Sequence, residues 1–313
     1  MSIKITGQKN ELTESEKIYF HGLLKGRYAI GPQLGRTGLQ TSVYLMQDEH
    51  NQSFVLKIPN DINDLNWTKS QENTIVQCKK ILKGYSGDVY IPTVLDIGKG
   101  YTVEPFAGIE LTTMLYDSLD MQEKQKIVHD FAYLLYYLHA NNPVGISSPL
   151  GMFNKPTLNE VFDYMQSTFD FEQKHYIMDI IKHFNERDTA DEVTVMTHAD
   201  IRSQNVLYCK EQKRLAVIDF ELAKQRNIYH DFVPTAAASF CLPYDMLFEI
   251  VCQYNQMAEP SNIAVNLDKI KLLHQLGIFH EYGRCAIFRD TKGDDLMAVN
   301  KIIFDCMRGV HTQ

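Results

Sequence analysis

Short segments of alternating apolar and polar residues, separated by turn-forming residues, fill the first third of the chain. Such segments predict strands of an antiparallel sheet. The predicted strands cover residues 27–34, 43–47, 53–58, 93–97 and 101–104. Between the third and fourth of them, Ile75, Cys78 and Ile81 recur at helical spacing, which predicts a helix over 67–83 that Gly84 ends.

Helical periodicity dominates the rest of the chain from about residue 109. Asp120 and Glu123 form a capping-box pattern, and Ile127, Phe131 and Leu138 then follow on one helix face. Further helices are predicted over residues 157–168, 171–187, 242–256, 265–276 and 294–308, with Gly277 and Gly309 as stops for the last two. Residues 193–220 interrupt the helices with short strands and a loop.

This pattern predicts an α+β fold with two lobes and a boundary near residues 106–109. Residues 1–106, of which 1–24 form an extension, would make a small antiparallel-sheet lobe with one helix. Residues 107–313 would make a larger, mainly helical lobe. The length of 313 residues suits this division, because it exceeds one average domain of ~100–200 residues.

Composition and charge narrow the class of protein. The formal net charge is −8, which argues against a nucleic-acid-binding surface. Six cysteines without a CxxC pair are typical of reduced thiols rather than of a disulfide framework or a zinc site. The first residues lack the apolar core of a signal peptide, and no segment approaches the ~18 apolar residues of a membrane span. We therefore expect a cytoplasmic protein without a nucleic-acid or membrane partner.

Two neighbouring segments carry the chemistry, THADIRSQNVLY (197–208) and LAVIDFE (215–221). Asp200 can accept the proton of an attacking hydroxyl group. Asn205 and Asp219 offer the hard oxygen ligands that Mg²⁺ prefers. The order is an aspartate, an asparagine five residues later, and then an apolar strand that ends in a second aspartate. This order indicates phosphoryl transfer.

With these residues the chain resembles the protein-kinase-like superfamily, over roughly residues 27–235. More narrowly, it is similar to the aminoglycoside phosphotransferase and choline kinase branch. The resemblance implies an enzyme that transfers the γ-phosphoryl group of ATP or GTP, with Mg²⁺, to a hydroxyl group. It gives Asp200 the role of catalytic residue and gives Arg202 the role of a cation that neutralises the transferring group. The alternative for Arg202 is an ion pair with a local acid.

The same resemblance assigns a phosphate-binding loop. GRTGLQTSVY (35–44) takes the place of the family's glycine-rich loop, in which Gly35, Thr37, Gly38 and Ser42 would contact the nucleotide. The loop departs from the family pattern, because Thr37 and Gln40 stand at expected glycine positions. The loop alone is therefore a weak signal.

Four further nucleotide-binding residues follow from the resemblance. Lys57 matches the strand lysine that contacts the α- and β-phosphates, and Glu72 matches the helix glutamate that pairs with this lysine. VEPFAG (103–108) matches the segment between the lobes. There, the carbonyl of Glu104 and the amide of Phe106 would face the adenine edge.

Three departures from protein kinases favour a small-molecule acceptor. Ala199 stands where many protein kinases have an arginine. Asp231 follows Asp219 by only twelve positions, and no Ala-Pro-Glu follows. About 60 residues lie between His139 and Asp200, which suits a helical insert that builds an acceptor site. A compact protein kinase and a nucleotide-binding pseudokinase remain as alternatives.

The distribution of charge bears on the acceptor. Residues 1–107 carry a net charge of +1, whereas residues 108–313 carry −9. The surplus of acidic residues in 108–313 either forms an ordinary solvated surface or creates a negative field that attracts a cationic ligand. Several of its carboxylates lie in the insert and the C-terminal helices, where the resembled family forms its acceptor cleft. We therefore expect a cationic acceptor such as an aminoglycoside or a choline-like amino-alcohol.

Overall fold

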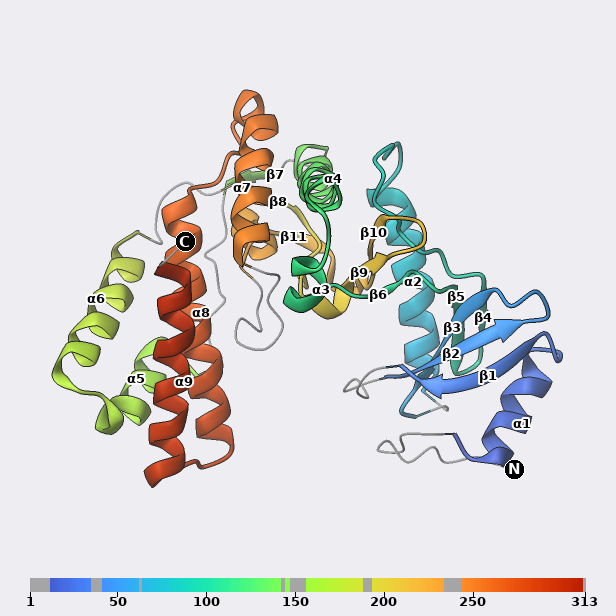
Figure 1. Ribbon diagram of the computed structural model, residues 1–313, viewed down its shortest axis with the longest axis horizontal. Coiled ribbons are helices and arrows are strands. Elements are labelled where there is room, and N and C mark those ends of the chain that lie inside the picture. The colour runs from blue at the N-terminus through green and yellow to red at the C-terminus, as the bar shows by residue number, and fades with distance from the viewer. Residues whose placement is uncertain are drawn as a thin grey trace. The chain divides into compact units, whose positions relative to one another are not determined.

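The computed structural model describes residues 12–34, 41–61, 64–141, 144–146, 156–187, 193–233 and 244–311 (Figure 1). The chain divides into two compact units. Unit 1 comprises Met1–Lys83 and Tyr90–Gly108, and unit 2 comprises Gly84–Val89 and Ile109–Gln313. No helix among the described residues is long and apolar enough to cross a membrane.

Unit 1 is built on a five-stranded antiparallel sheet with the strand order β1-β2-β3-β5-β4. Its strands are β1 (Tyr28–Gln33), β2 (Thr41–Asp48), β3 (Ser53–Pro59), β4 (Asp96–Gly98) and β5 (Tyr101–Pro105). Its helices are α1 (Glu14–Leu23) and α2 (Leu65–Ile81). The predicted strands and the predicted helix therefore form, with ends that differ by a few residues.

The two faces of this sheet have different chemistry, because successive side chains of a strand point to opposite faces. One face is apolar and packs with Phe20 and Leu24 at α1. Its buried residues include Tyr44, Met46, Leu56, Ile58 and Val103. On the other face lie Lys57 and Thr102, which are paired across β3 and β5, and Glu104 two residues further along β5. The backbone hydrogen bonds of the sheet thus hold Lys57, Thr102 and Glu104 in fixed positions.

Helix α1 lies in the segment that the sequence left as an extension. It begins with a capping box, in which the Thr13 side chain accepts a hydrogen bond from the Glu16 amide and the Glu16 carboxylate accepts one from the Thr13 amide. The pattern Thr-x-x-Glu is the usual sequence signature of such a start. The signal was therefore present in the sequence, and it predicts this helix.

Unit 2 contains two small sheets and most of the helices. The sheets have the orders β10-β9-β6 and β11-β8-β7. Their strands are β6 (Ile109–Glu110), β7 (Val144–Ile146), β8 (Val193–Thr197), β9 (Val206–Cys209), β10 (Arg214–Val217) and β11 (Lys224–Asn227). The helices are α3 (Thr113–Asp117), α4 (Met121–Ala140), α5 (Leu158–Met165), α6 (Phe171–Arg187), α7 (Tyr244–Ala258), α8 (Leu267–Phe288) and α9 (Gly293–His311). The 3₁₀ turns are η1 (Gln166–Thr168), η2 (Ser203–Asn205), η3 (Phe220–Leu222), η4 (Ile228–Asp231) and η5 (Glu259–Ser261).

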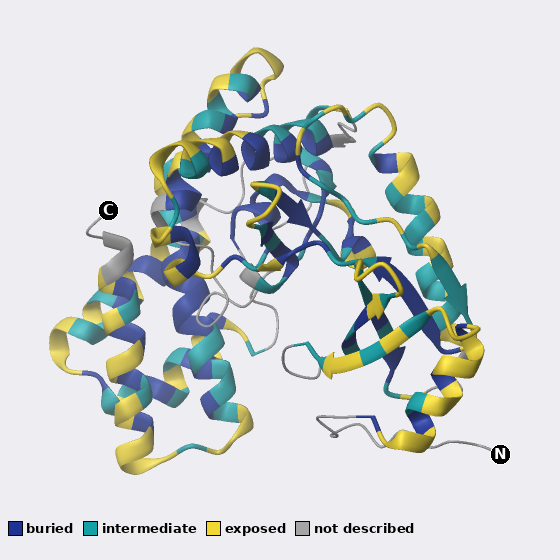
Figure 2. Cartoon of the chain, turned by 45° about the vertical axis from the view of Figure 1, so that its right-hand side comes forward, coloured by how far each residue is buried: buried dark blue, intermediate teal, exposed yellow. Residues whose placement is uncertain are grey.

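Amphipathic periodicity explains most of these helices, which bury one side and expose the other (Figure 2). Helix α4 starts with the predicted capping box of Asp120 and Glu123. Ile127, Phe131 and Leu138 of α4 are buried, as the spacing predicted. An antiparallel-sheet unit and a mainly helical unit confirm the predicted α+β class.

Two predicted helix ends are wrong. Helix α8 continues through Gly277 to Phe288, and α9 continues through Gly309 to His311. A second glycine of α8 shows what such a residue can do inside a helix. A Cβ atom on Gly283 would lie 2.2 Å from Cγ1 of Val161 on α5. Gly283 therefore allows α5 and α8 to approach closely, and this packing outweighs the low helix propensity of glycine.

Candidate active site

The segment from β8 to β9 positions the predicted catalytic residues of unit 2. Asp200 follows β8, and Asn205 closes the turn η2 immediately before β9. The side-chain amide of Asn205 donates to the backbone carbonyl of Asp200 at 2.9 Å and to its Oδ2 at 2.8 Å. The structure thus brings Asp200 and Asn205 together, five residues apart, and fixes the orientation of both side chains.

Arg202 adds a cation to the same carboxylate. Its Nη2 lies 2.9 Å from Oδ2 of Asp200, and the Asp200 side chain is 10% exposed. Oδ2 therefore receives both Arg202 and Asn205. Among the described residues, no group hydrogen-bonds Oδ1 of Asp200. The two oxygens of this carboxylate are thus different, one anchored and the other available to a substrate.

Asp219 is presented by an unusual backbone. It follows β10 with φ 66° and ψ 61°, a left-handed conformation that is uncommon outside glycine. The amide of the preceding Ile218 donates to the carbonyl of Asn205 at 2.9 Å, which ties the two ligand-bearing segments together. Such conformations persist where the surrounding structure imposes them, and they cluster at functional sites.

The oxygen atoms of Asn205 and Asp219 fit a hard divalent cation. Because Nδ2 of Asn205 is bound to Asp200, Oδ1 is the atom left for a ligand. Within the described part of the chain, neither this Oδ1 nor the Asp219 carboxylate has a protein partner. No group of three or more His, Cys, Asp or Glu side chains placed to hold a metal occurs among the described residues. Mg²⁺ needs no such group, since it is usually held by one or two protein carboxylates together with substrate phosphates and water.

A buried carboxylate, Asp231, orders the backbone in front of Asp200. Its Oδ2 accepts the His198 amide at 2.9 Å, and its Oδ1 accepts the Ala199 amide at 2.7 Å. Its Oδ2 also lies 3.2 Å from Nε2 of His139. Burial by itself raises the pKa of Asp231, but the hydrogen bond and charge of His139 and the Ala199 amide outweigh it and lower the pKa. Ala199 is held at φ 65°, so this clamp also maintains a strained backbone.

His139 supports the clamp from α4. Its Nδ1 lies 2.9 Å from the Tyr254 hydroxyl oxygen, which itself lies 3.0 Å from the carbonyl oxygen of Ile263. Because a carboxylate only accepts hydrogen bonds, Nε2 carries a proton toward Asp231. The His139 and Asp231 side chains are both fully buried, so their contact is shielded from water.

In unit 1 the predicted lysine has a different partner from the one expected. Lys57 Nζ lies 2.9 Å from Oε1 of Glu104, a residue of β5. Glu72 is exposed on α2, and the structure shows no ion pair between it and Lys57. The sequence reasoning missed Glu104 as the partner, because it considered the backbone of Glu104 and not its side chain.

The two backbone groups expected to face adenine, the Glu104 carbonyl and the Phe106 amide, are engaged with β3. The Phe106 amide donates to the Ser53 carbonyl at 3.1 Å, so it belongs to the ladder with β3. Antiparallel pairs alternate along a ladder, so the backbone groups of Glu104, which is paired with Val55, also face β3. The alternation turns the Pro105 carbonyl away from β3. The Ala107 amide, in a residue only 6% exposed, has no hydrogen bond to any described residue.

The remaining loop residues contribute less. Gly35, Thr37 and Gly38 lie outside the described residues. Ser42 is paired with Ile58 on the apolar face, is buried, and hydrogen-bonds Tyr44. This placement is on the opposite face from Lys57 and argues against the predicted phosphate contact of Ser42.

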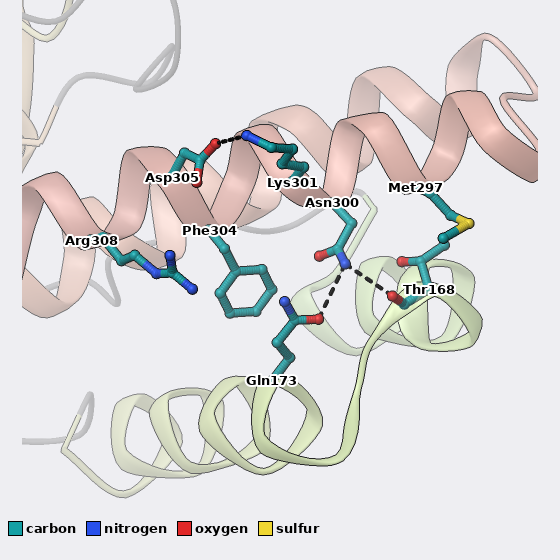
Figure 3. A pocket seen from close by; sticks show the side chains of 8 residues that line it. All are labelled: Thr168, Gln173, Met297, Asn300, Lys301, Phe304, Asp305 and Arg308. Carbon is teal, nitrogen blue, oxygen red and sulfur yellow. Dashed lines mark hydrogen bonds and ion pairs between the residues drawn. The ribbon is translucent and has the colours of Figure 1, made fainter.

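A pocket of about 270 Å³ lies between α6 and α9 (Figure 3). Polar side chains and two apolar ones, Met297 and Phe304, line it. The polar residues are Thr168, Gln173, Asn300, Lys301, Asp305 and Arg308. Asn300 donates to the Thr168 carbonyl at 2.9 Å and to Gln173 Oε1 at 3.2 Å. None of the predicted site residues lines this pocket.

The fold and the β8–η3 residues define a phosphotransferase of the kinase-like class. Residues 35–258 match the model of the phosphotransferase enzyme family, and the chain belongs to this family. It is an enzyme that acts on an alcohol group, as the sequence predicted. No curated protein sequence matches the chain.

Solved structures show the same fold at low sequence identity. The aminoglycoside phosphotransferase APH(2'')-Ib with ADP bound has a TM-score of 0.55 and 16% identity, over 95% of this chain and 98% of that chain. The GDP complex of aminoglycoside 2'-phosphotransferase-IIIa has a TM-score of 0.62 and 15% identity, over 93% and 98%. The macrolide 2'-phosphotransferase MphH from Brachybacterium faecium has a TM-score of 0.57 and 13% identity, over 96% and 99%. These similarities confirm the predicted kinase-like fold.

Proposed function

We propose that the protein transfers the γ-phosphoryl group of ATP, with Mg²⁺, to a hydroxyl group of a small cationic molecule. The observation that carries this proposal is the asymmetry of the Asp200 carboxylate. Arg202 and Asn205 occupy Oδ2, whereas Oδ1 has no partner among the described residues. A carboxylate fixed in this way orients an acceptor hydroxyl and accepts its proton at a defined atom.

The balanced reaction assigns each atom of the transfer. The acceptor oxygen forms a bond to the γ-phosphorus, the bond from that phosphorus to the bridging oxygen breaks, and the acceptor proton passes to Oδ1 of Asp200. Arg202 forms the ion pair with a local acid that was its alternative role, because it pairs with Asp200. From this position its charge would also neutralise negative charge on the transferring group. Asp200 and Arg202 are therefore the proposed catalytic residues.

The metal and the nucleotide have their own residues. Asn205 Oδ1 and the Asp219 carboxylate would hold Mg²⁺, which supplies charge neutralisation on the β- and γ-phosphate oxygens when it is bound. Lys57 would contact the α- and β-phosphates. The Pro105 carbonyl and the Ala107 amide replace the predicted Glu104 and Phe106 groups as the atoms that meet the base.

A cationic acceptor is supported by the charge of residues 108–313. Glu172, Asp179, Glu249 and Glu259 are exposed on helices or turns of unit 2, where they contribute to its negative field. Glu160 instead caps α5, so not every acidic residue serves this field. Similar structures have been solved with streptomycin and ATP, with gentamicin, and with kanamycin and GDP. Streptomycin, gentamicin and kanamycin are cationic aminoglycosides with several hydroxyl groups, which agrees with the proposed class.

The proposal is tested by a coupled assay of nucleotide consumption over a panel of alcohols. The panel holds aminosugars and amino-alcohols, with neutral and carboxylated sugars of similar size as controls. The amine-bearing compounds should be turned over, and their KM should rise with ionic strength because salt screens the attraction beyond about 8 Å. Turnover restricted to carboxylated compounds, or transfer only to protein, would refute the cationic small-molecule acceptor.

A further inference from the structure

Glu104 holds a position that combines two tasks. Its carboxylate pairs with Lys57, and its backbone directly precedes the Pro105 carbonyl, the first group that turns away from the ladder with β3. If Glu72 on α2 held Lys57, as expected, position 104 of β5 could carry an uncharged side chain. Here the anchoring charge instead stands on β5, next to the atoms that meet the base.

The pair is shielded from water. The side chains of Lys57 and Glu104 are 20% and 11% exposed, so the charge of Glu104 acts in a medium of reduced polarity. A neighbour on α2 responds to this environment, because burial and the charge of Glu104 raise the pKa of Cys78 to about 11. Lys57 contacts Oε1 of Glu104, and the second carboxylate oxygen is not in that ion pair.

The groups along this segment form an ordered pattern of acceptors and donors. It consists of the Glu104 carboxylate, an acceptor; the Pro105 carbonyl, an acceptor; and the Ala107 amide, a donor. Adenine presents a 6-amino group with two hydrogens, followed by the acceptor N1. Guanine presents the acceptor O6, followed by the donor N1–H. The pattern matches adenine in each place and opposes guanine in each place.

We propose that Glu104 selects an adenine nucleotide over a guanine nucleotide as the phosphoryl donor while it anchors Lys57. This inference rests on the proposed function for the identity of the site and of the donor, and it adds the side chain that selects that donor. A shielded carboxylate accepts a hydrogen bond from a 6-amino group, whereas it faces the O6 oxygen of guanine with like partial charge. The difference of a charge-assisted hydrogen bond corresponds to a preference on the order of 10- to 100-fold.

The experiment measures binding of MgATP, MgGTP and MgITP to the full chain by thermal shift and calorimetry, together with their turnover. ITP carries O6 but lacks the 2-amino group of guanine. Wild-type protein should bind ATP at least about tenfold more tightly than both GTP and ITP. Glu104→Gln, whose amide can donate to O6, should reduce this ratio about tenfold. Lys57→Ala should weaken all three nucleotides and leave the ratio unchanged, because Lys57 serves phosphates that they share.

The outcomes separate this inference from the proposed function. Equal binding of ATP and ITP, or a ratio in Glu104→Gln that equals the wild-type ratio, would overturn the role of Glu104. If wild-type protein discriminates as expected but transfers no phosphoryl group to any alcohol, the selection stands and the proposed function fails. Equal binding of ATP and ITP by the wild-type protein would overturn the role of Glu104 even if Glu104→Gln does not fold.

Discussion

Replacement of Asp231 by asparagine tests the clamp that places the catalytic aspartate. An asparagine fits the space, but its side chain has one acceptor oxygen and one NH₂ donor. The carboxylate has two acceptor oxygens. In its better orientation it loses the 2.7 Å bond from the Ala199 amide. It also replaces the charged acceptor of His139 with a neutral one, and both partners are fully buried.

The magnitude follows from these losses. A hydrogen bond to a charged group contributes about 1.5–3 kcal/mol, and the variant loses one such bond from Ala199 and weakens a second one from His139. We expect Asp231→Asn to lower the free energy of unfolding by about 3–5 kcal/mol at pH 7. Urea denaturation followed by circular dichroism measures this value. Asp305→Asn, at an exposed ion pair of α9, is the matched control and should leave stability nearly unchanged.

The pH dependence of this difference has a defined sign. The pKa of Asp231 is lower in the folded protein than in the unfolded chain. The contribution of Asp231 is therefore complete above the unfolded pKa of about 3.9, and it declines as the pH falls through the lower folded pKa. A loss below about 1 kcal/mol for Asp231→Asn at pH 7 would refute the clamp, since one buried hydrogen bond alone accounts for that much.

Two further predictions concern the backbone. Gly283→Ala should destabilise the protein by about 1–3 kcal/mol, because its Cβ would meet Val161 at 2.2 Å. Gly22→Ala on α1 meets no atom within 4 Å, and it should stabilise the protein by about 0.5–1 kcal/mol. Equal effects of the two alanines in urea denaturation would contradict the packing argument. Ala199→Gly should stabilise the protein by up to about 1 kcal/mol, because glycine adopts φ 65° without strain, and a destabilised variant would count against the strain.

The sequence predicted the parts of this protein that local pattern determines. The alternation of β2, β3 and β5, the capping box at Asp120 and the order of Asp200, Asn205 and Asp219 are all encoded within short windows. The α+β class, the kinase-like fold and the phosphotransferase family followed from them and are confirmed. The same reasoning overlooked α1, although Thr13 and Glu16 carried its signal.

What the sequence could not predict depends on contacts between distant segments. The partner of Lys57 is 47 positions away on another strand, and neither spacing nor residue type distinguishes Glu104 from Glu72. The ladder between β3 and β5 decides which backbone groups near Phe106 are free. Gly277 predicts a helix end from the sequence pattern alone, but α8 is buried on many sides and continues through it. These errors share one cause, because tertiary packing can outweigh local propensity.

The central claim is that Asp200 accepts the proton of the acceptor hydroxyl through its free Oδ1. The most direct measurement is the rate of γ-phosphoryl transfer by wild-type protein and by Asp200→Asn, with MgATP binding measured on the same samples. We expect Asp200→Asn to bind MgATP within about twofold of wild type and to lose transfer by about 10²–10⁴-fold, the range of general-base catalysis. Transfer by Asp200→Asn within tenfold of the wild-type rate would contradict it.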